Sequence, residues 1–296
     1  MAIGRPGRVG AVLLTAAVLL AGCAKPTAGT PAPDRVAADA ITVKAGIKAF
    51  QDHFADLGDE HAKAFNYLNY GDTKLTTEHE SYKRGDPPTT LLERRQDEAG
   101  DASAILHLPD DDTRDYVRLD ARHAHLAPTP WVSVPTLYAG GFQTCFLLTA
   151  WLACHLDNAI SQTKLDAPDR QPARAQRTAG GVEVTTGALL GLMLDEGFIS
   201  IPEDKRDGIT QAMRSAMVPV TIKLTADMEF TGFEIRGKVA DGDAEPLELQ
   251  VGYEVLGSSS AADFPPKPAA KEVTAITDQK AADKFWEDFN ARDPGN

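Results

Sequence analysis

Two stretches in the second half of the chain alternate between apolar side chains and side chains of other kinds. In residues 218–224 every second residue is valine, isoleucine or leucine, and residues 247–255 repeat the pattern with five apolar or aromatic residues. Because successive side chains of a strand point to opposite faces, each stretch predicts a strand. Between these two stretches, the alternation of apolar residues shifts by one position at Gly232, which predicts a β-bulge. Strands of this kind are typical of an antiparallel sheet that is covered on one face and solvated on the other.

Shorter segments add strands and helices to this sheet. Strand-like composition occurs in residues 75–82, 91–95, 102–108, 116–126 and 182–186. Apolar spacing predicts a helix at 43–54, and acidic residues in a first turn predict a helix at 201–217. A short helix is expected at 59–70, ended by Gly71. Residues 163–180 predict a loop. The chain is therefore expected to adopt an α+β fold in which helices cover an antiparallel sheet.

The N-terminus has the three-part layout of an export signal. Arg5 and Arg8 precede an apolar run over residues 9–20, which leads through small residues to Cys23. A run of about a dozen apolar residues is too short to cross a bilayer, which needs about 20. Residues 20–23 (LAGC) resemble the lipobox of bacterial lipoproteins, which implies cleavage before Cys23 and a diacylglycerol on its sulfur. The alternative is an ordinary secretory signal that contains a cysteine.

The organisation of the chain follows from this N-terminus. We expect a signal peptide at 1–22, a flexible Pro- and Ala-rich spacer at 23–38 that begins with the lipidated Cys23, one α+β domain at 39–290, and a tail at 291–296. The mature protein is then exported, carries acyl chains such as palmitate, and is anchored to the outer face of the bacterial cell membrane. Two acyl chains at about 0.8 kcal/mol per buried methylene suffice for stable attachment.

The charge balance excludes one class of partner. The chain has 43 acidic and 30 basic residues, a formal net charge of −13, and the expected cleavage removes two of its arginines. Nucleic-acid binding needs clustered Lys and Arg, so we expect no nucleic-acid partner. Anionic membrane surfaces are repelled as well, so attachment to the membrane has to come from the lipid.

Cys145 and Cys154 remain as a pair once Cys23 carries lipid. An exported protein meets an oxidising compartment, in which disulfides persist. Nine residues of straight helix span about 13.5 Å, whereas bonded cysteines have Cα atoms about 4.4–6.8 Å apart. If the two are bonded, residues 142–155 must therefore turn between them. The alternative is two buried free thiols on one apolar helix.

Signals for catalysis and metal binding are weak. His123 and His125 would share one face of a strand, but a metal needs a further ligand such as His107 or His155; the alternative is two histidines on a partly solvated face. The chain contains no G-x-S-x-G, H-E-x-x-H or P-loop motif. We expect no cofactor, no metal and no catalytic residue, and an enzyme is the third hypothesis for function.

Large apolar residues gather in the middle of the chain. If this region covers the concave side of a curved sheet, its side chains line an apolar cavity for a lipid chain. The candidate ligand-binding residues are Phe142, Phe146, Leu147, Trp151, Leu189, Leu192 and Met193. The alternative is an ordinary filled core, which the sequence does not distinguish from a cavity.

A second apolar group lies near the C-terminus. Ala282, Phe285, Trp286 and Phe289 are spaced as one stripe of a helix. The stripe predicts that a final helix docks on the domain. The alternative is that it binds a partner.

The order of these elements resembles a family of envelope lipoproteins. The resemblance is carried by residues 219–222, 247–255, 129–132 (TPWV) and the proline-rich end at 263–268, and it covers most of residues 70–270 in pattern. The family is that of the LppX/LprG-type lipoproteins, which are similar in fold to the LolA/LolB carriers. The resemblance implies a strongly curved, half-barrel-like antiparallel sheet covered by helices, with an acyl chain between them. The cysteine pair and the polar strand at 75–82 depart from the pattern.

Two functions are consistent with these features. The first is a lipid-anchored cell-envelope lipoprotein that binds or carries a lipid or other amphiphile non-covalently. The second is an interaction or scaffolding lipoprotein with a filled core and no ligand, which contacts an envelope protein partner through residues 278–296.

Overall fold

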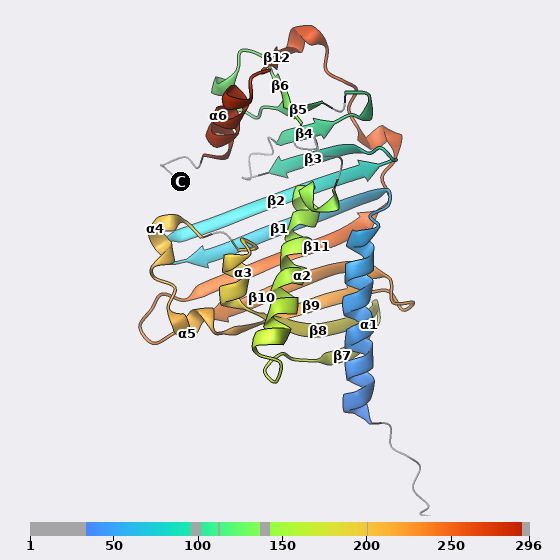
Figure 1. The fold of residues 1–296 in the computed structure, drawn as a ribbon, viewed down its shortest axis with the longest axis vertical. Helices are drawn as coiled ribbons and strands as arrows, with labels where there is room; N and C mark the ends of the chain where they lie inside the picture. Colours follow the sequence, from blue (N-terminus) through green and yellow to red (C-terminus); the bar gives the residue numbers. More distant parts are fainter. Residues whose placement is uncertain (1–33, 96–101, 112, 137–142, 200, 292–296) are drawn as a thin grey trace, which may run out of the picture. The chain divides into compact units, whose positions relative to one another are not determined.

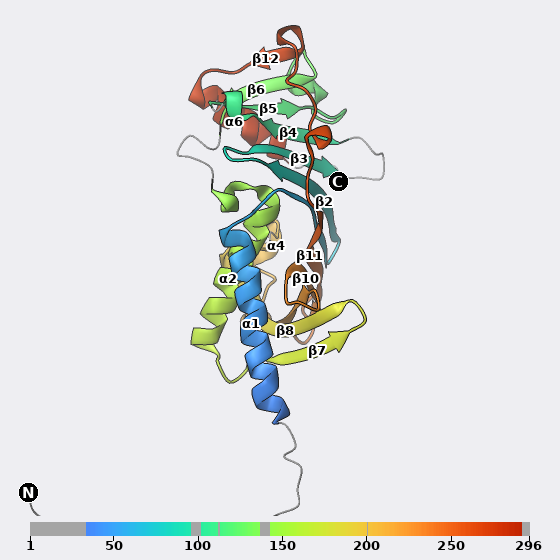
Figure 2. The same cartoon turned by 90° about the vertical axis from the view of Figure 1, so that its right-hand side faces the viewer.

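One open sheet of twelve strands forms the frame of residues 36–296 in the computed structural model (Figure 1). The strand order is β12-β6-β5-β4-β3-β2-β1-β11-β10-β9-β8-β7. Neighbouring strands pair antiparallel, except that β12 runs parallel to β6. The sheet is curved and carries helices on one face (Figure 2), which confirms the α+β, half-barrel-like fold expected from the sequence.

The structure describes residues 34–95, 102–111, 113–136, 143–199 and 201–291. The sheet belongs to the compact unit of residues 36–296. The expected signal peptide and the lipobox with Cys23 lie outside the described residues, as do most of the spacer and nearly all of the tail.

The elements have the following bounds. The strands are β1 (Glu60–Tyr70), β2 (Thr73–Arg84), β3 (Thr89–Arg95), β4 (Ser103–His107), β5 (Arg114–Arg118), β6 (Trp131–Pro135), β7 (Arg174–Thr178), β8 (Gly181–Leu189), β9 (Met217–Leu224), β10 (Phe230–Val239), β11 (Leu247–Gly257) and β12 (Val273–Ala275). The helices are α1 (Arg35–Ala55), α2 (Leu148–Asp166), α3 (Leu190–Asp195), α4 (Glu203–Arg206), α5 (Gln211–Arg214) and α6 (Gln279–Asn290). Among the described helices, none is both long and apolar enough to cross a membrane.

The strands predicted at 75–82, 91–95, 102–108, 182–186, 218–224 and 247–255 are confirmed. β2, β3, β4, β8, β9 and β11 lie where the sequence placed strands. The pairing of β10 with β9 shifts register between Phe230 and Gly232, which confirms the bulge. A Cβ atom at Gly232 would lie 2.5 Å from the carbonyl oxygen of Tyr253, so this close approach of β10 to β11 requires glycine.

The prediction of a helix at 59–70 is wrong, because this segment forms the central strand β1. Ala62, Ala64, Leu68 and Tyr70 alternate along it and are at most 3% exposed. β1 pairs with β2 on one side and with β11 on the other. The partner β11 is remote in sequence, so local spacing gave no sign of this strand.

Three further expectations need correction. The strand expected at 116–126 ends at Arg118, where the chain enters turns. The helix expected at 201–217 is two short helices, α4 and α5, separated at Gly208, and the loop expected at 163–180 contains β7. A Cβ atom at Gly208 would lie 2.3 Å from the Tyr70 hydroxyl, so the chain approaches β1 here too closely for a residue with a side chain.

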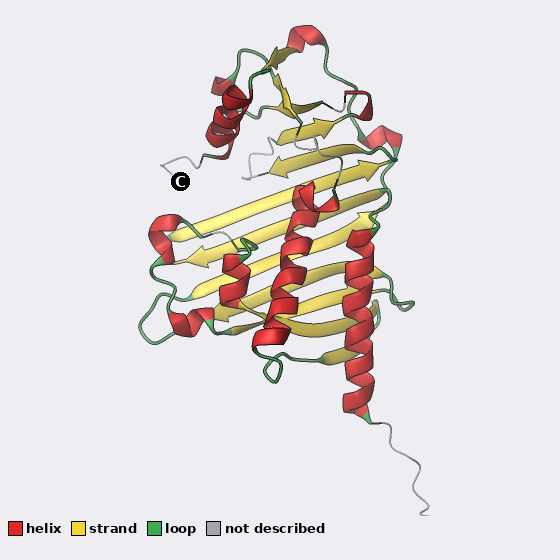
Figure 3. Cartoon of the chain, viewed as in Figure 1, coloured by secondary structure: helices red, strands yellow, loops and turns green. Residues whose placement is uncertain are grey.

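Helices α1, α2 and α3 lie on one face of the sheet, which we call the helix side (Figure 3). α1 turns its predicted stripe towards the sheet: Phe50 packs against Phe230 with ring centroids 5.6 Å apart, and Phe54 against Tyr253 at 5.2 Å. α1 begins at Arg35, so the last residues of the expected spacer are helical.

The C-terminal helix α6 docks on the same face at the other end of the sheet. Phe285 and Phe289 are buried in one cluster with Val117 of β5 and Val132 of β6. The expected docking of a final helix is thereby confirmed. The opposite face of these strands is covered by the segment that contains Phe264.

Candidate functional site

An apolar layer separates the helix side of the sheet from α1, α2 and α3. Five neighbouring strands contribute side chains that are at most 1% exposed: Leu68 in β1, Val251 in β11, Ile235 in β10, Val220 in β9 and Val184 in β8. The three helices contribute Phe50, Leu156 and Leu190 to the same cluster. The layer therefore runs without interruption beneath three separate helices.

The structure places most of the described candidate ligand-binding residues at this layer. Leu147 and Met193 are buried in it, and Trp151 and Leu192 are partly buried and pack against it. Leu189 ends β8 next to the buried Ala188, so by strand alternation it faces away from the layer.

Two candidates are not placed by the structure. Phe142 lies outside the described residues, and so does the side chain of Phe146.

The entry into α2 is fixed by the expected disulfide. Cys145 and Cys154 are bonded, with Cα atoms 6.0 Å apart. Cys145 belongs to a 3₁₀ turn at Thr144–Phe146, and the helix begins only at Leu148. The predicted turn between the cysteines is therefore present, because a continuous helix would hold them too far apart.

The helices over the layer are joined to one another by polar contacts at their exposed sides. Gln51 Nε2 of α1 donates a hydrogen bond of 2.8 Å to Asp157 Oδ1 of α2. Asn158 Nδ2 of α2 donates one of 3.3 Å to Glu196 Oε2, just after α3. Exposed polar pairs of this type contribute little stability, so the helices are held over the sheet chiefly by the apolar layer itself.

The helix side turns polar where β1, β2 and β3 meet. His79 pairs in register with Ala64 on one side and with Arg94 on the other, and Asn66 pairs with Thr77. Residues directly opposite in a sheet share a face, and Ala64 is buried in the layer, so all of these side chains point to the helix side. We call Asn66, Thr77, His79 and Arg94 the polar centre. It was not predicted from the sequence, although the polar composition of β2 was its signal.

A second polar group lies within the layer at the start of β1. The carboxylate of Glu60, which is 6% exposed, accepts a hydrogen bond from the Tyr253 hydroxyl and lies 2.7 Å from His53 Nε2. Burial, followed by the negative charge of Glu60, raises the pKa of Tyr253 well above its ordinary value. The contact joins β1 to β11, which is a structural role.

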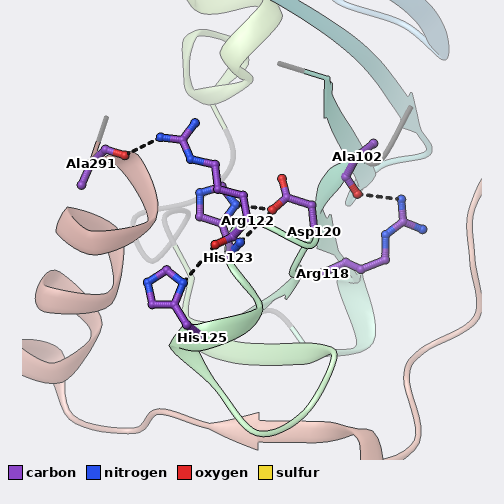
Figure 4. Close-up of polar contacts among 7 residues, drawn as sticks. All are labelled: Ala102, Arg118, Asp120, Arg122, His123, His125 and Ala291. Carbon is purple, nitrogen blue, oxygen red and sulfur yellow. Dashed lines mark hydrogen bonds and ion pairs between the residues drawn. The ribbon is translucent and has the colours of Figure 1, made fainter. Parts of the chain in front are cut away.

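The histidine pair considered for metal binding lies on a turn and not on a strand (Figure 4). The 3₁₀ turn Ala124–Leu126 follows His123 directly. His123 Nδ1 lies 2.5 Å from Asp120 Oδ1, whereas His125 Nδ1 lies 3.0 Å from the carbonyl oxygen of Arg122. The two rings therefore have separate partners and do not share a strand face.

The other histidines considered as ligands are engaged elsewhere. His107 Nδ1 lies 2.9 Å from Asp115 Oδ1 in a buried pair between β4 and β5. His155 Nδ1 lies 3.7 Å from Glu196 Oε2 beside α3. Within the part of the chain that the structure describes, no three His, Cys, Asp or Glu residues are grouped as metal ligands.

A groove of about 390 Å³ lies away from the candidate residues. It is lined by Tyr67, Asn69, Arg236, Gly237, Lys238, Glu248, Leu249 and Gln250. Its cations are paired with carboxylates: Lys238 Nζ lies 2.6 Å from Glu248 and Arg236 lies 2.9 Å from Glu234. None of the candidate ligand-binding residues lines it.

Comparison with known proteins finds likeness in structure alone. No protein-family model matches the chain, and no curated protein matches it in sequence. Among solved structures, the Mycobacterium tuberculosis lipoprotein LppX is similar at 14% identity and a TM-score of 0.34, over 71% of this chain and 93% of that chain. An uncharacterized conserved protein from Thermus thermophilus is similar at 11% identity and a TM-score of 0.33, over 77% of this chain and 98% of that chain.

A putative outer membrane lipoprotein-sorting protein domain from Vibrio parahaemolyticus is similar at 10% identity and a TM-score of 0.23, over 75% of this chain and 95% of that chain. These matches confirm the weak resemblance to LppX and the lipoprotein-sorting proteins that the sequence indicated.

Proposed function

We propose that this protein is a lipid-anchored envelope lipoprotein that binds the acyl chain of a lipid or other amphiphile between its helices and the helix side of its sheet. The observation that carries the proposal is the continuous apolar layer beneath α1, α2 and α3. Binding is non-covalent and uses apolar side chains, with Trp151, Leu192 and Met193 among them. Attachment to the membrane through Cys23 is part of the proposal.

The way the helices are held supports this proposal. Polar contacts at exposed positions, such as Gln51 with Asp157, join α1 to α2. Such contacts part at low energetic cost, and the apolar contacts that are lost when the helices leave the sheet are offset by burial of the acyl chain, at about 0.8 kcal/mol per methylene. An acyl chain that enters between helices and sheet therefore replaces apolar contacts with other apolar contacts.

Native mass spectrometry tests the proposal on the chain without residues 1–22 and with Cys23→Ser. This change leaves every described element in place, because the first helix begins at Arg35. The expected result is a complex with one amphiphile, either co-purified or taken up from added fatty acid. Protein that carries no lipid and takes none up would count against the proposal.

A matched pair of variants locates the binding. Ala153 of α2 is 1% exposed and faces the layer, whereas Ser161 of the same helix is exposed. Ala153→Leu should reduce uptake by filling space at the layer, and Ser161→Leu should leave it unchanged. Circular dichroism checks that both variants are folded.

An interaction lipoprotein without a ligand is the second candidate. Val36 and Ile41 in the first turns of α1 are 80% and 71% exposed, so their side chains are accessible to another molecule. The C-terminal stripe does not support this function, because Phe285 and Phe289 are buried against β5 and β6. Cross-linking from positions 36 and 41 in cells tests it, with recovery of one defined envelope protein as the expected result.

A further inference from the structure

Helix α1 crosses the sheet and begins beyond one of its edges. Phe54, in its last turn, packs against Tyr253 of β11. Two turns earlier, a Cβ atom at Gly46 would lie 2.8 Å from a side-chain carbon of Val184 in β8. Only β7 lies beyond β8 in the sheet. The first turns of α1 therefore reach past the β7 edge, as two views of the fold show (Figure 1 and Figure 2).

Helix α2 ends at the same edge of the sheet. Near its end, Thr163 Oγ1 accepts a hydrogen bond of 2.9 Å from the backbone N–H of Leu189 in β8. Leu165 follows two residues later, and a turn then leads into β7. The beginning of α1, the end of α2 and the edge strand thus lie at one end of the sheet. We call it the β7 end and define it as residues 36–41, 164–170 and 174–178.

The β7 end has most of the large apolar side chains that are exposed in the described part of the chain. Val36 is 80% exposed, Ile41 71% and Leu165 74%. The fourth such residue is Leu256 in β11, four strands from β7, at 45%. A single exposed apolar residue is ordinary on a protein surface. Three of four at one end, on two helices, indicate a surface that contacts an apolar medium.

The β7 end also has cations that make no ion pair or hydrogen bond with another residue that the structure describes. They are Lys164 in α2 and Arg174 and Arg177 in β7, and all three are exposed. The β7 end contains four basic and three acidic residues, whereas the whole chain has a net charge of −13. Repulsion from anionic lipid is therefore small at this end, and its arginines are suited to pair with lipid phosphates.

The proposed lipid anchor connects to the β7 end through a short segment. Residues 24–34 separate Cys23 from the start of α1. A segment of this length spans about 20 Å on average and about 40 Å when fully extended. Strands lie about 4.8 Å apart, so the sheet extends about 50 Å from β7 to β12. An anchor at Cys23 therefore holds the β7 end, and not the β12 end, close to the bilayer.

We propose that the β7 end is the surface with which this protein lies on a phospholipid membrane. Val36, Ile41 and Leu165 insert among the acyl chains, and Arg174 and Arg177 pair with head-group phosphates, as amphipathic basic side chains do at interfaces. The sheet then stands on its β7 edge, with α6 and β12 away from the bilayer. This inference goes beyond the proposed function and rests on it only through the anchor at Cys23.

Fluorescent labels at single engineered cysteines test the inference. The chain without residues 1–22 carries a hexahistidine tag in place of Cys23 and is held on nickel-chelating lipid in vesicles of phosphatidylcholine and phosphatidylglycerol. This tether replaces the anchor, so the result does not depend on lipidation. Cys145 and Cys154 are bonded, so the engineered cysteine is the one free thiol. The variants are Ile41→Cys, Leu165→Cys and, as the matched control, Leu256→Cys, each labelled with NBD.

The labels report which side chains enter the bilayer. Labels at positions 41 and 165 should shift their emission to the blue and be quenched by nitroxide-bearing lipids. The label at position 256 should stay in water, although Leu256 is also an exposed apolar residue. Equal quenching at the three positions, or quenching at none, would overturn the inference. Neither result would affect acyl-chain binding, which native mass spectrometry tests separately.

Vesicle flotation of the untethered Cys23→Ser chain measures the same contact as an affinity. Ile41→Ser combined with Leu165→Ser should weaken binding by about 10-fold or more, and Leu256→Ser should leave it unchanged. Removal of the arginines at 174 and 177, each replaced by Gln, should weaken binding to phosphatidylglycerol vesicles by about 5-fold per residue. Circular dichroism checks that all variants are folded.

Two other occupants of the β7 end are outcomes of these experiments. Self-association of the chain in solution that is lost in Ile41→Ser would assign the apolar residues to a contact between copies. Labels that stay in water, together with a defined envelope protein cross-linked from position 36 or 41, would assign them to a protein partner. Either result would overturn the membrane contact.

Discussion

Thr149 Oγ1 donates a hydrogen bond of 2.7 Å to Ser81 Oγ, and both residues are buried. The bond joins the first turn of α2 to the helix side of β2, two residues from His79 of the polar centre. It therefore fixes the start of α2 beside the polar centre. The disulfide of Cys145 and Cys154 restrains the same end of the helix.

Removal of one partner of this bond should destabilise the fold. Thr149→Val keeps the shape but leaves the Ser81 hydroxyl buried and unpaired, which costs about 1–3 kcal/mol. Urea denaturation measures the loss. The double variant Ser81→Ala with Thr149→Val should cost less than the two single losses added together, because no unpaired group remains. If the loss in the double variant equals the sum of the two single losses, the hydrogen bond between Thr149 and Ser81 does not stabilise the fold.

Loss of the disulfide should also lower stability. The bond closes a loop with a sequence separation of 9, for which restriction of the unfolded chain predicts about 2–3 kcal/mol. The variant with serine at both Cys145 and Cys154 should unfold at correspondingly lower urea, measured without reductant. Peptide mapping of the unreduced wild type should recover the two cysteines in one linked peptide. Two free thiols there would contradict the structure.

The C-terminal helix should stabilise its own end of the sheet. Phe285 is 5% exposed and packs against Val132 of β6. Phe285→Ala should cost about 3–5 kcal/mol and speed amide exchange most in β5 and β6. Lys284→Ala, at an exposed position of the same helix, serves as the control and should change little. Similar losses for the two variants would show that α6 is not docked as described.

The histidine of the polar centre should make stability depend on pH. The pKa of His79 is lowered to about 4 by burial and then by Arg94, whereas the unfolded chain has an ordinary value near 6.5. The unfolded state therefore binds the extra proton between pH 6.5 and pH 4. The contribution of His79 to the free energy of unfolding is fully present above pH 6.5. It decreases as the pH drops through this window, by about 1–2 kcal/mol at pH 5.

Variants measure this contribution directly. The difference in unfolding free energy between pH 7 and pH 5 should shrink in His79→Gln. It should stay as in the wild type in His125→Gln, which removes a histidine from an exposed turn. An unchanged pH dependence in His79→Gln, or an NMR titration of His79 near pH 6.5, would contradict the account.

The parts of the fold that sequence predicted well are those in which the pattern is local. Strict alternation identified β9 and β11, and a phase slip at Gly232 located the bulge in β10. The spacing of Phe50 and Phe54 identified the face of α1 that packs on the sheet. These signals depend on neighbours a few residues apart, which one sequence contains in full.

The misassigned segments depend on partners remote in sequence. Residues 60–70 contain small residues such as Ala62 and Ala64, which suit a helix as well as a strand. Their strand state is set by pairing with β11, nearly two hundred positions away in the register of Ala62 with Val255. The polar centre was missed for a different reason: His79 and Arg94 face each other through the register of β2 with β3, which the pattern along a single strand does not reveal.

Photolabelling with a diazirine fatty acid tests the central claim most directly, since it reports where an acyl chain lies. On the Cys23→Ser chain without residues 1–22, label should be found in peptides of α2 and α3, at residues 147–166 and 190–199. Unlabelled fatty acid should compete it away. Label confined to the groove at Tyr67 and Arg236, or label that does not compete, would contradict binding between the helices and the sheet.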